Sequence, residues 1–209
     1  MAIDPKTRVD RLKRANPTRK PDLDTEGRVP PGQYLTEKFP VLTHGPTPKV
    51  DPARWQFRIF GLVAEDILWT YEEFMALPQV DLTSDFHCVT RWSQLDNTWT
   101  GVPITEIVTR IGIRREAKYV MVHAYGGYTT NLPLVDLLSE DVIFAHSRNG
   151  EPLSADHGWP LRLIVPKLYA WKSAKWVNAL EFMAEDQAGF WEGYGYHNHG
   201  DPWTEERFS

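Results

Sequence analysis

Cysteine, long apolar runs and an excess of basic residues are all scarce or missing in this chain of 209 residues. The single cysteine, Cys88, excludes an intramolecular disulfide and every zinc or iron–sulfur site that needs several thiolates. No stretch approaches the ~20 consecutive apolar residues that a membrane-spanning helix requires, so we expect no membrane span. The formal net charge of −5 argues against general nucleic-acid binding, which needs a surplus of Lys and Arg.

Sequence signatures of several common cofactor enzymes are also missing. The chain has no glycine-rich phosphate loop, which makes a nucleotide a weaker candidate than another phosphorylated cofactor. It has neither the His-Glu-x-x-His helix of hydrolytic zinc enzymes nor the Cys-x-x-Cys-His motif that attaches haem. Any metal chemistry must therefore use one thiolate or none.

Aromatic residues, in contrast, are abundant: the chain has nine Trp, eight Tyr and nine Phe. Such side chains fill a β-rich core or line a deep, rigid pocket, and composition alone does not separate these two uses. The apolar share of 42% and the charged share of 24% are typical of globular proteins. The length fits one domain.

The order of the predicted elements indicates a mixed, strand-rich α+β domain rather than a doubly wound sheet. Residues 1–35 are polar and predict an extended N-terminal arm, and residues 36–209 predict a single folded domain with an irregular C-terminal tail. Alternating apolar residues predict strands, and Thr70 with Glu73 forms a capping box that predicts a short helix up to Leu77. The principal predicted strands are 55–59, 118–124, 142–146, 161–165 and 176–183.

Cys88 lies just beyond the end of a predicted strand, with His87 before it and Arg91 three residues after it. Nearby positive charge lowers the pKa of a thiol and favours the thiolate, which is both a nucleophile and a soft metal ligand. A lone cysteine is also commonly a small buried apolar residue. Cys–His protease chemistry is a further possibility, although no family signature surrounds this cysteine.

A second group of residues has the chemistry of a phosphate site. Arg162 follows His157 on a predicted strand, and Lys172 and Lys175 flank a turn that contains Ser173. A guanidinium, an ammonium and backbone amides are the groups that bind phosphate, but an ordinary solvated basic turn has the same composition. The pair His197 and His199 could ligate a metal, yet two histidines in an irregular tail are more often surface residues.

Four stretches of this sequence, in this order, resemble the molybdopterin-binding domain of the sulfite oxidase family, in its small bacterial branch. The resemblance extends from about Phe39 to Asp186. The four stretches are Leu42-Thr43-His44-Gly45-Pro46, His87-Cys88-Val89-Thr90-Arg91-Trp92-Ser93, Asp156-His157-Gly158-Trp159-Pro160-Leu161-Arg162 and Trp171-Lys172-Ser173-Ala174-Lys175-Trp176.

The resemblance implies an α+β fold of the sulfite oxidase type and a single molybdenum atom bound by molybdopterin and by one protein thiolate. That thiolate would come from Cys88, which suits a soft metal. Arg91 would hold an oxyanion near the metal or orient the pterin, and Tyr128 would line the pocket or belong to the core. The resemblance assigns cofactor binding to Thr43, His44, His123, His157, Arg162, Ser173 and Lys175.

The implied reaction is a two-electron oxygen-atom transfer. It would oxidise a small oxo-acceptor such as sulfite, or reduce an S-oxide or N-oxide, while the protein supplies geometry and electrostatics. The stretch Leu42-Thr43-His44 lacks the arginine that sulfite oxidases generally have there, which argues against sulfite. No haem motif is present, so we expect a separate electron-transfer partner.

Other departures from the family bear on assembly and location. Little sequence follows Asp186, too little for the C-terminal dimerisation domain of sulfite oxidases, so we expect a monomer. No twin-arginine leader is evident, which predicts a cytoplasmic protein. A non-catalytic molybdopterin-binding or carrier protein and a Cys–His hydrolase remain as alternatives to the oxidoreductase.

Overall fold

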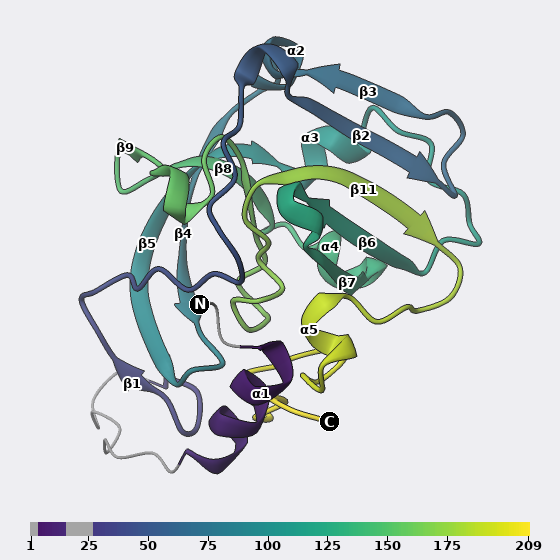
Figure 1. Ribbon diagram of the computed structural model, residues 1–209. Coiled ribbons are helices and arrows are strands. Elements are labelled where there is room, and N and C mark those ends of the chain that lie inside the picture. Colours follow the sequence, from purple (N-terminus) through teal and green to yellow (C-terminus); the bar gives the residue numbers. More distant parts are fainter. Residues whose placement is uncertain (1–3, 16–26) are drawn as a thin grey trace.

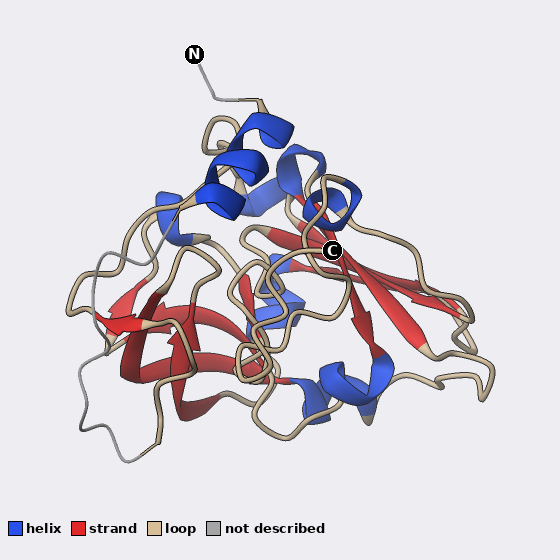
Figure 2. Cartoon of the chain, turned by 90° about the horizontal axis from the view of Figure 1, so that it is seen from below, coloured by secondary structure: helices blue, strands red, loops and turns tan. Residues whose placement is uncertain are grey.

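The computed structural model describes residues 4–15 and 27–209, which form two β-sheets connected by loops and short helices (Figure 1). Figure 2 shows the two groups of strands on opposite sides of the molecule. The first sheet contains β1 (Tyr34–Leu35), β4 (Val80–His87), β5 (Trp92–Pro103), β8 (Ile143–Arg148), β9 (Glu151–Pro152) and β10 (Arg162–Ile164). The second contains β2 (Gln56–Gly61), β3 (Ile67–Thr70), β6 (Tyr119–Ala124), β7 (Thr129–Pro133) and β11 (Val177–Met183).

The first sheet is organised around β5, its longest strand. This strand forms an antiparallel hairpin with β4, pairs with β8 further along, and is parallel to the short β1. Strand β10 pairs with the other edge of β8. Because the β4–β5 hairpin places Cys88 at its turn, this sheet fixes the position of the single thiol.

The second sheet has the order β3-β2-β11-β6-β7, in which β11 is parallel to β2 and antiparallel to β6. The predicted alternation is confirmed in β2, where Phe57 and Ile59 are fully buried while Gln56 and Arg58 are exposed. A mixture of parallel and antiparallel pairs with few helices is the strand-rich α+β architecture that the sequence predicts.

The helices are short. They are α1 (Pro5–Arg14), α2 (Tyr71–Met75), α3 (Ile104–Val108), α4 (Leu134–Leu137) and α5 (Phe190–Gly193), with 3-10 turns η1 (Pro52–Arg54), η2 (Tyr125–Gly127) and η3 (Ala155–His157). The predicted capping box at the start of α2 is confirmed, because the side chains of Thr70 and Glu73 each accept from the other residue's backbone N–H. Within residues 4–15 and 27–209, no helix has the length and apolar character needed to cross a bilayer.

Part of the predicted extended arm is helical. Asp4 accepts a hydrogen bond from the Thr7 N–H and Pro5 occupies the first turn, which are both signals for the start of a helix. Tyr34 and Leu35 pair with β5 and therefore belong to the first sheet. Residues 1–3 and 16–26 of the predicted arm lie outside the described residues. The division of the chain at residue 35 stays a prediction.

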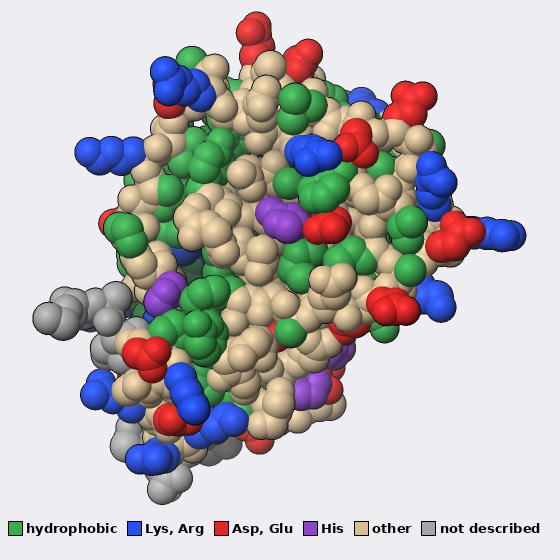
Figure 3. Space-filling view, turned by 45° about the vertical axis from the view of Figure 1, so that its right-hand side comes forward, with side chains coloured by type: hydrophobic (Ala, Val, Ile, Leu, Met, Phe, Trp, Pro, Cys, Tyr) green, Lys and Arg blue, Asp and Glu red, His purple; other side chains and the backbone are tan. Residues whose placement is uncertain are grey.

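Two clusters of buried side chains stabilise the fold. One contains most of the buried aliphatic residues, including Val122 and Leu180, together with Phe57. The other is rich in aromatic residues and includes Cys88. On the face shown in Figure 3, acidic and basic side chains are interspersed, so that face has no patch of one sign.

Candidate active site

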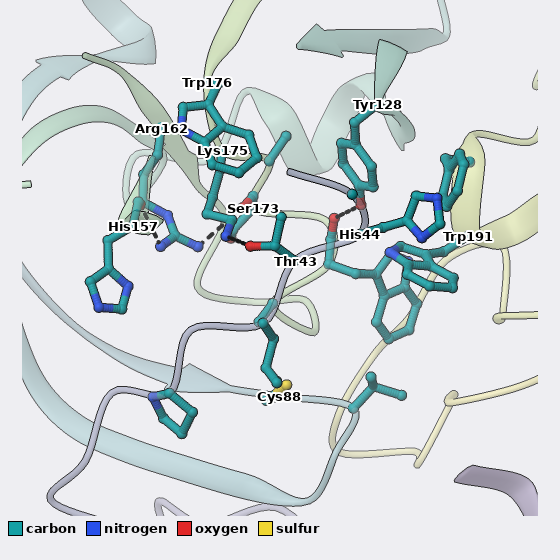
Figure 4. Close-up of a pocket in the computed structure, with 18 of the residues that line it drawn as sticks. Thr43, His44, Cys88, Tyr128, His157, Arg162, Ser173, Lys175, Trp176 and Trp191 are labelled. Carbon is teal, nitrogen blue, oxygen red and sulfur yellow. Dashed lines mark hydrogen bonds between the residues drawn. The ribbon is translucent and has the colours of Figure 1, made fainter. Parts of the chain in front are cut away.

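A cavity of about 480 Å³ brings together residues that are far apart in the sequence (Figure 4). Its walls come from α1, the loop 39–48, the β4–β5 turn, η2, residues 157–176, α5 and Tyr196. Seven of the residues that the sequence analysis selected line this cavity. They are Thr43, His44, Cys88, His157, Arg162, Ser173 and Lys175.

Cys88 is held by the turn that joins β4 to β5. Its N–H donates to the carbonyl of Trp92 at 2.9 Å, and its carbonyl accepts from the Arg91 N–H, also at 2.9 Å. Arg91 has a φ of +76°, the left-handed conformation that commonly ends a three-residue hairpin loop. The turn therefore fixes the Cys88 backbone, and its side chain lines the cavity.

The surroundings of the thiol differ from the sequence prediction. Burial raises the pKa of Cys88, and this effect outweighs the opposing effects of Thr90, Arg8 and Arg207. His87 does not supply the expected positive charge, because burial lowers its pKa to about 4. A metal bound here would have to displace the thiol proton, as metals bound to cysteine generally do.

Arg162 and Lys175 are neighbours across an isolated β-bridge, and with His157 they form what we call the cationic end of the cavity. Arg162 is 5% exposed, and its guanidinium donates only to the carbonyls of His157 at 3.1 Å and Ser173 at 3.3 Å. Its Nε has no hydrogen-bond partner among the described residues. The guanidinium carbon lies 5.2 Å from the ring centre of Phe86. This charge is therefore buried beside aromatic rings.

Lys175 extends the positive charge. Its ammonium donates to the Thr43 hydroxyl and to the carbonyl of Asp156. Burial and the nearby Arg162 lower the pKa of Lys175 to about 7. Burial, with Arg162 and Lys175 next in importance, lowers the pKa of His157 to about 4, so its imidazole is neutral at pH 7.

Among the described residues that line the cavity, no acidic side chain balances these charges. Of the described residues that line it, Arg8, Arg162 and Lys175 are cationic and none is Asp or Glu. Burial lowers the pKa of Arg162 to about 9, which still leaves the guanidinium protonated at neutral pH. Buried charges without a partner are costly, so the cavity has the electrostatics of an anion-binding site.

Gly158 allows the cationic end to form. It has a φ of +114°, and a Cβ at this position would lie 2.9 Å from the Cβ of Arg162 and 3.1 Å from that of Lys175. Any larger residue would push these two side chains away, in addition to straining its own backbone. This glycine lies within the stretch from Asp156 to Arg162, whose sequence alone does not indicate its role.

In the turn at residues 171–175, some polar side chains line the cavity and others are buried away from it. The Ser173 hydroxyl accepts from the Val165 N–H at 2.9 Å, which secures the turn behind Arg162. Lys172, in contrast, is outside the set of lining residues and is fully buried, with its ammonium 2.6 Å from a Glu192 carboxylate oxygen. Because this charge is already paired, the geometry favours neither a phosphate contact nor a solvated position for Lys172.

Aromatic side chains form the other side of the cavity, which we call the aromatic end. It comprises Tyr128, Trp171, Phe190, Trp191 and Tyr196. The Tyr128 hydroxyl donates to the Trp171 carbonyl at 2.6 Å. In Figure 4, Tyr128, His44 and Trp191 lie on the opposite side of the view from His157, Arg162 and Lys175, with Cys88 below and between them.

Some residues of the aromatic end were not selected from the sequence. Phe190, Trp191 and Tyr196 belong to a segment without periodicity, and Arg8 comes from α1. The ring centre of His44 lies 4.8 Å from that of Phe190, so this predicted residue contacts the unpredicted segment directly. For Phe190, Trp191 and Tyr196, the high aromatic content of the chain was the only signal.

The structure does not bring His123 or Arg91 to the cavity. The Nε2 of His123 is 2.9 Å from Glu181 Oε2, and both side chains are about one-third exposed. His123 lies between buried Val122 and Ala124 on β6, and alternate side chains of a strand face opposite sides. This geometry supports neither the assignment of His123 to the pterin nor either role considered for Arg91, which were to hold an oxyanion near the metal or to orient the pterin.

The histidines of the C-terminal tail form a separate cluster. His199 lies between Asp136 and Glu206, with 2.9 Å from a ring nitrogen to a carboxylate oxygen on each side. Within the described ranges, no group of three or more His, Cys, Asp or Glu residues has an arrangement that could hold a metal. Both ring nitrogens of His199 thus already have carboxylate partners.

Residues 44–191 match the oxidoreductase molybdopterin-binding domain family. The chain is 48% identical over 187 residues to the uncharacterized oxidoreductase YuiH of Bacillus subtilis, covering 89% of this chain and 94% of that protein. It is 31% identical over 169 residues to the putative protein-methionine-sulfoxide reductase subunit YedZ1 of Azospira oryzae, covering 79% of this chain and 64% of that protein.

Among solved structures, the sulfane dehydrogenase SoxCD of Paracoccus pantotrophus has a similar fold. The TM-score is 0.62 at 22% identity, and the similarity covers 68% of this chain and 41% of that one. This likeness concerns the fold alone. Together with the match over residues 44–191, the sequence relatives show that this chain belongs to the oxidoreductase molybdopterin-binding domain family and is a sulfite oxidase-like oxidoreductase.

Proposed function

We propose that this protein binds molybdenum through Cys88, binds the anionic end of molybdopterin at the cationic end of the cavity, and catalyses a two-electron oxygen-atom transfer. One observation supports this most strongly. The only cysteine of the chain lines the same cavity as buried Arg162 and half-buried Lys175, which have no acidic side chain among the described lining residues to balance them.

The residues of the cavity fit such a cofactor. A phosphate would supply the missing negative charge and accept from the unpartnered Arg162 Nε–H. The ammonium of Lys175 provides further donors, and Ser173 holds the Arg162 guanidinium from behind through its carbonyl. A cysteine thiolate suits molybdenum, which takes soft sulfur ligands in this role.

The side chains have distinct tasks in this proposal. Cys88 ligates the metal after losing its proton, and Arg162 with Lys175 binds the anionic group. Neutral His157 can donate one hydrogen bond and accept another, while Thr43 and His44 contact the pterin. When bound, the cofactor supplies the two-electron redox centre and the transferable oxygen, and the protein orients it and limits access of water.

The substrate in this proposal is a small oxo-acceptor or an S-oxide or N-oxide. The relatives include proteins named sulfite oxidase and a protein named a putative methionine-sulfoxide reductase subunit, and these names describe an oxidation and a reduction. Both directions pass two electrons to or from the cofactor. The chain has no haem-attachment motif, so a separate electron-transfer partner belongs to the proposal.

The geometry does not favour the hydrolase alternative. A Cys–His hydrolase needs a histidine within hydrogen-bond reach of the nucleophile. The sulfur of Cys88 instead lies 3.1 Å from the Thr90 hydroxyl oxygen, and no described histidine hydrogen-bonds to it. A carrier protein would share the cofactor site but would not turn over.

The proposal is tested with protein purified from a host that makes the cofactor. We expect one molybdenum and one pterin per chain, and turnover with at least one oxo-acceptor or oxo-donor. Cys88→Ser should abolish the thiolate-to-molybdenum absorption and lower activity by more than about 100-fold, because changes outside the ligand set already cost 10–100-fold.

Thr90→Val provides the matched control, since it removes only the hydrogen bond to the sulfur and should retain the metal. Wild-type protein without molybdenum, or Cys88→Ser protein with full absorption and activity, would contradict the proposal. Cofactor-loaded protein without turnover on any tested substrate would identify a carrier instead.

A further inference from the structure

A third cation, Arg8, lines the cavity from a helix outside the matched range of residues 44–191. Its Nη1 donates to the Thr43 carbonyl at 3.3 Å, and its guanidinium carbon lies 5.2 Å from the ring centre of Trp191. Arg8 is thus half-buried at the aromatic end of the cavity, whereas Arg162 and Lys175 form the cationic end.

The helix that bears Arg8 is docked on the rest of the protein. Val9 is 2% exposed and belongs to the aromatic-rich cluster that includes Cys88. Lys13 donates to the Ser209 carbonyl at 3.2 Å, and its ammonium lies 5.6 Å from the ring centre of Phe208. These contacts hold α1, and they place the Arg8 guanidinium in the cavity wall.

The guanidinium has donors to spare. Arginine has five N–H groups, and one is used by the Thr43 carbonyl. No carboxylate of the described residues forms an ion pair with Arg8. Its closest ring is Trp191, and a guanidinium in contact with an aromatic face can still bind an anion at its edge. Arg8 contacts the carbonyl of Thr43, whose hydroxyl accepts from Lys175, so its remaining donors can bind a second anion next to the cationic end.

We propose that Arg8 determines substrate specificity by binding the anionic group of an organic substrate, whose apolar part packs against Phe190, Trp191 and Tyr196 beside Cys88. This inference rests on the proposed function, because it assigns the substrate of the same site.

The chemistry of the aromatic end favours an organic anion over an inorganic one. A fully desolvated sulfate or sulfite needs several charge-assisted donors to replace its hydration. This end offers one guanidinium, surrounded by rings that bind apolar groups well. A substrate with one anionic group and an apolar body satisfies both features of the wall.

The experiment uses the cofactor-loaded protein and measures the binding of benzenesulfonate and of sulfate by calorimetry. Wild-type protein should bind benzenesulfonate at least about tenfold more tightly than sulfate. Arg8→Gln should weaken benzenesulfonate binding by roughly tenfold or more, the usual effect of losing a hydrogen bond to an ion. Arg8→Lys should restore part of the affinity, because it retains the charge.

Arg11→Gln is the matched control, since Arg11 is exposed on the same helix and does not line the cavity. It should bind benzenesulfonate as the wild type does. Unchanged affinity in Arg8→Gln, or equal affinity of the wild type for sulfate and benzenesulfonate, would overturn the inference.

Molybdenum and pterin content, measured on each variant, distinguishes a failure of this inference from a failure of the proposed function. Loss of cofactor from Arg8→Gln alone would show that Arg8 holds the cofactor, which overturns its role in specificity. Wild-type protein without molybdenum would contradict the proposed function instead, and the benzenesulfonate titration would still report whether Arg8 binds the organic anion.

Discussion

The two ends of the cavity are built in different ways. The cationic end comes from one stretch, residues 157–175, in which Arg162 and Lys175 are paired by the backbone. The aromatic end takes Trp171 from the same stretch but gathers its other side chains from α1, the residue after η2, α5 and Tyr196. Local pairing fixes the first end, whereas the second depends on the packing of distant segments. The cationic end is thus suited to one constant ligand, and the aromatic end to discrimination among substrates.

The largest expected effect comes from adding one methyl group at each end of the cavity, by replacing a glycine with alanine. Gly158→Ala should destabilise the protein by roughly 2 kcal/mol or more, because it combines a positive φ with close contacts. It should also lower the molybdenum content by about tenfold or more, because it displaces Arg162 and Lys175. Chemical unfolding and metal analysis measure the two effects.

Gly126→Ala is the comparison at the aromatic end. Gly126 has a φ of +81°, and a Cβ there would meet no described atom within 4 Å. We expect a loss of stability of about 1–2 kcal/mol from the backbone alone, with molybdenum content per folded chain unchanged. Equal molybdenum loss in both variants would show that the close approach at Gly158 does not matter.

A smaller effect tests the charge at the cationic end. Lys175 has a pKa of about 7 in the cofactor-free protein, so it loses its charge as the pH rises through neutrality. Binding of sulfate, whose own charge is constant in this range, should therefore weaken by roughly tenfold from about pH 6 to about pH 8. Lys175→Arg should remove this pH dependence, because arginine stays protonated. A pH-independent affinity in the wild type would contradict the assignment.

The smallest effect concerns the segment that follows Tyr196. Hydrogen bonds from His199, first to Asp136 and then to Glu206, raise its pKa above 6.5. The stability from this charge is fully present below about pH 6.5 and is lost as the pH rises through the higher folded-state pKa.

His199→Gln should therefore reduce stability below about pH 6 and have little effect above about pH 9. We expect a difference below about 1 kcal/mol, because the side chain is 34% exposed and solvent screens the pairs. Urea unfolding at both pH values measures it. An equal effect of the substitution at the two values would show that the charge of His199 does not stabilise the tail.

The parts that the sequence predicted well depend on local patterns. Alternation identified β2 and β11, apolar runs identified β6, β8 and β10, and the Thr70–Glu73 pair identified the start of α2. The cationic end was also accessible, because its residues lie within one stretch and have chemistry that suits phosphate. Local signals of this kind survive in the fold because each element buries the face that its pattern specifies.

The parts that the sequence did not predict depend on tertiary contacts. Burial, which outweighs nearby charge, determines the pKa of Cys88, and it is not visible in a linear sequence. Lys172 and Lys175 look equivalent in the sequence, yet only one of them is paired with Glu192. Asp4 and Pro5 are a local signal for the start of α1, which the polar composition of the segment obscures. The docking of this helix beside the cavity has no local signature.

The tight turn between β4 and β5 has a consequence for protein engineering. Because side chains alternate along a hairpin, inserting one residue between His87 and Cys88 would move the sulfur to the other face of the strand pair. The exposed turn between β8 and β9, at Asn149 and Gly150, is not followed by a side chain of the site. Added loops or fused peptides are therefore best placed at the second turn, while the length of the first must be kept.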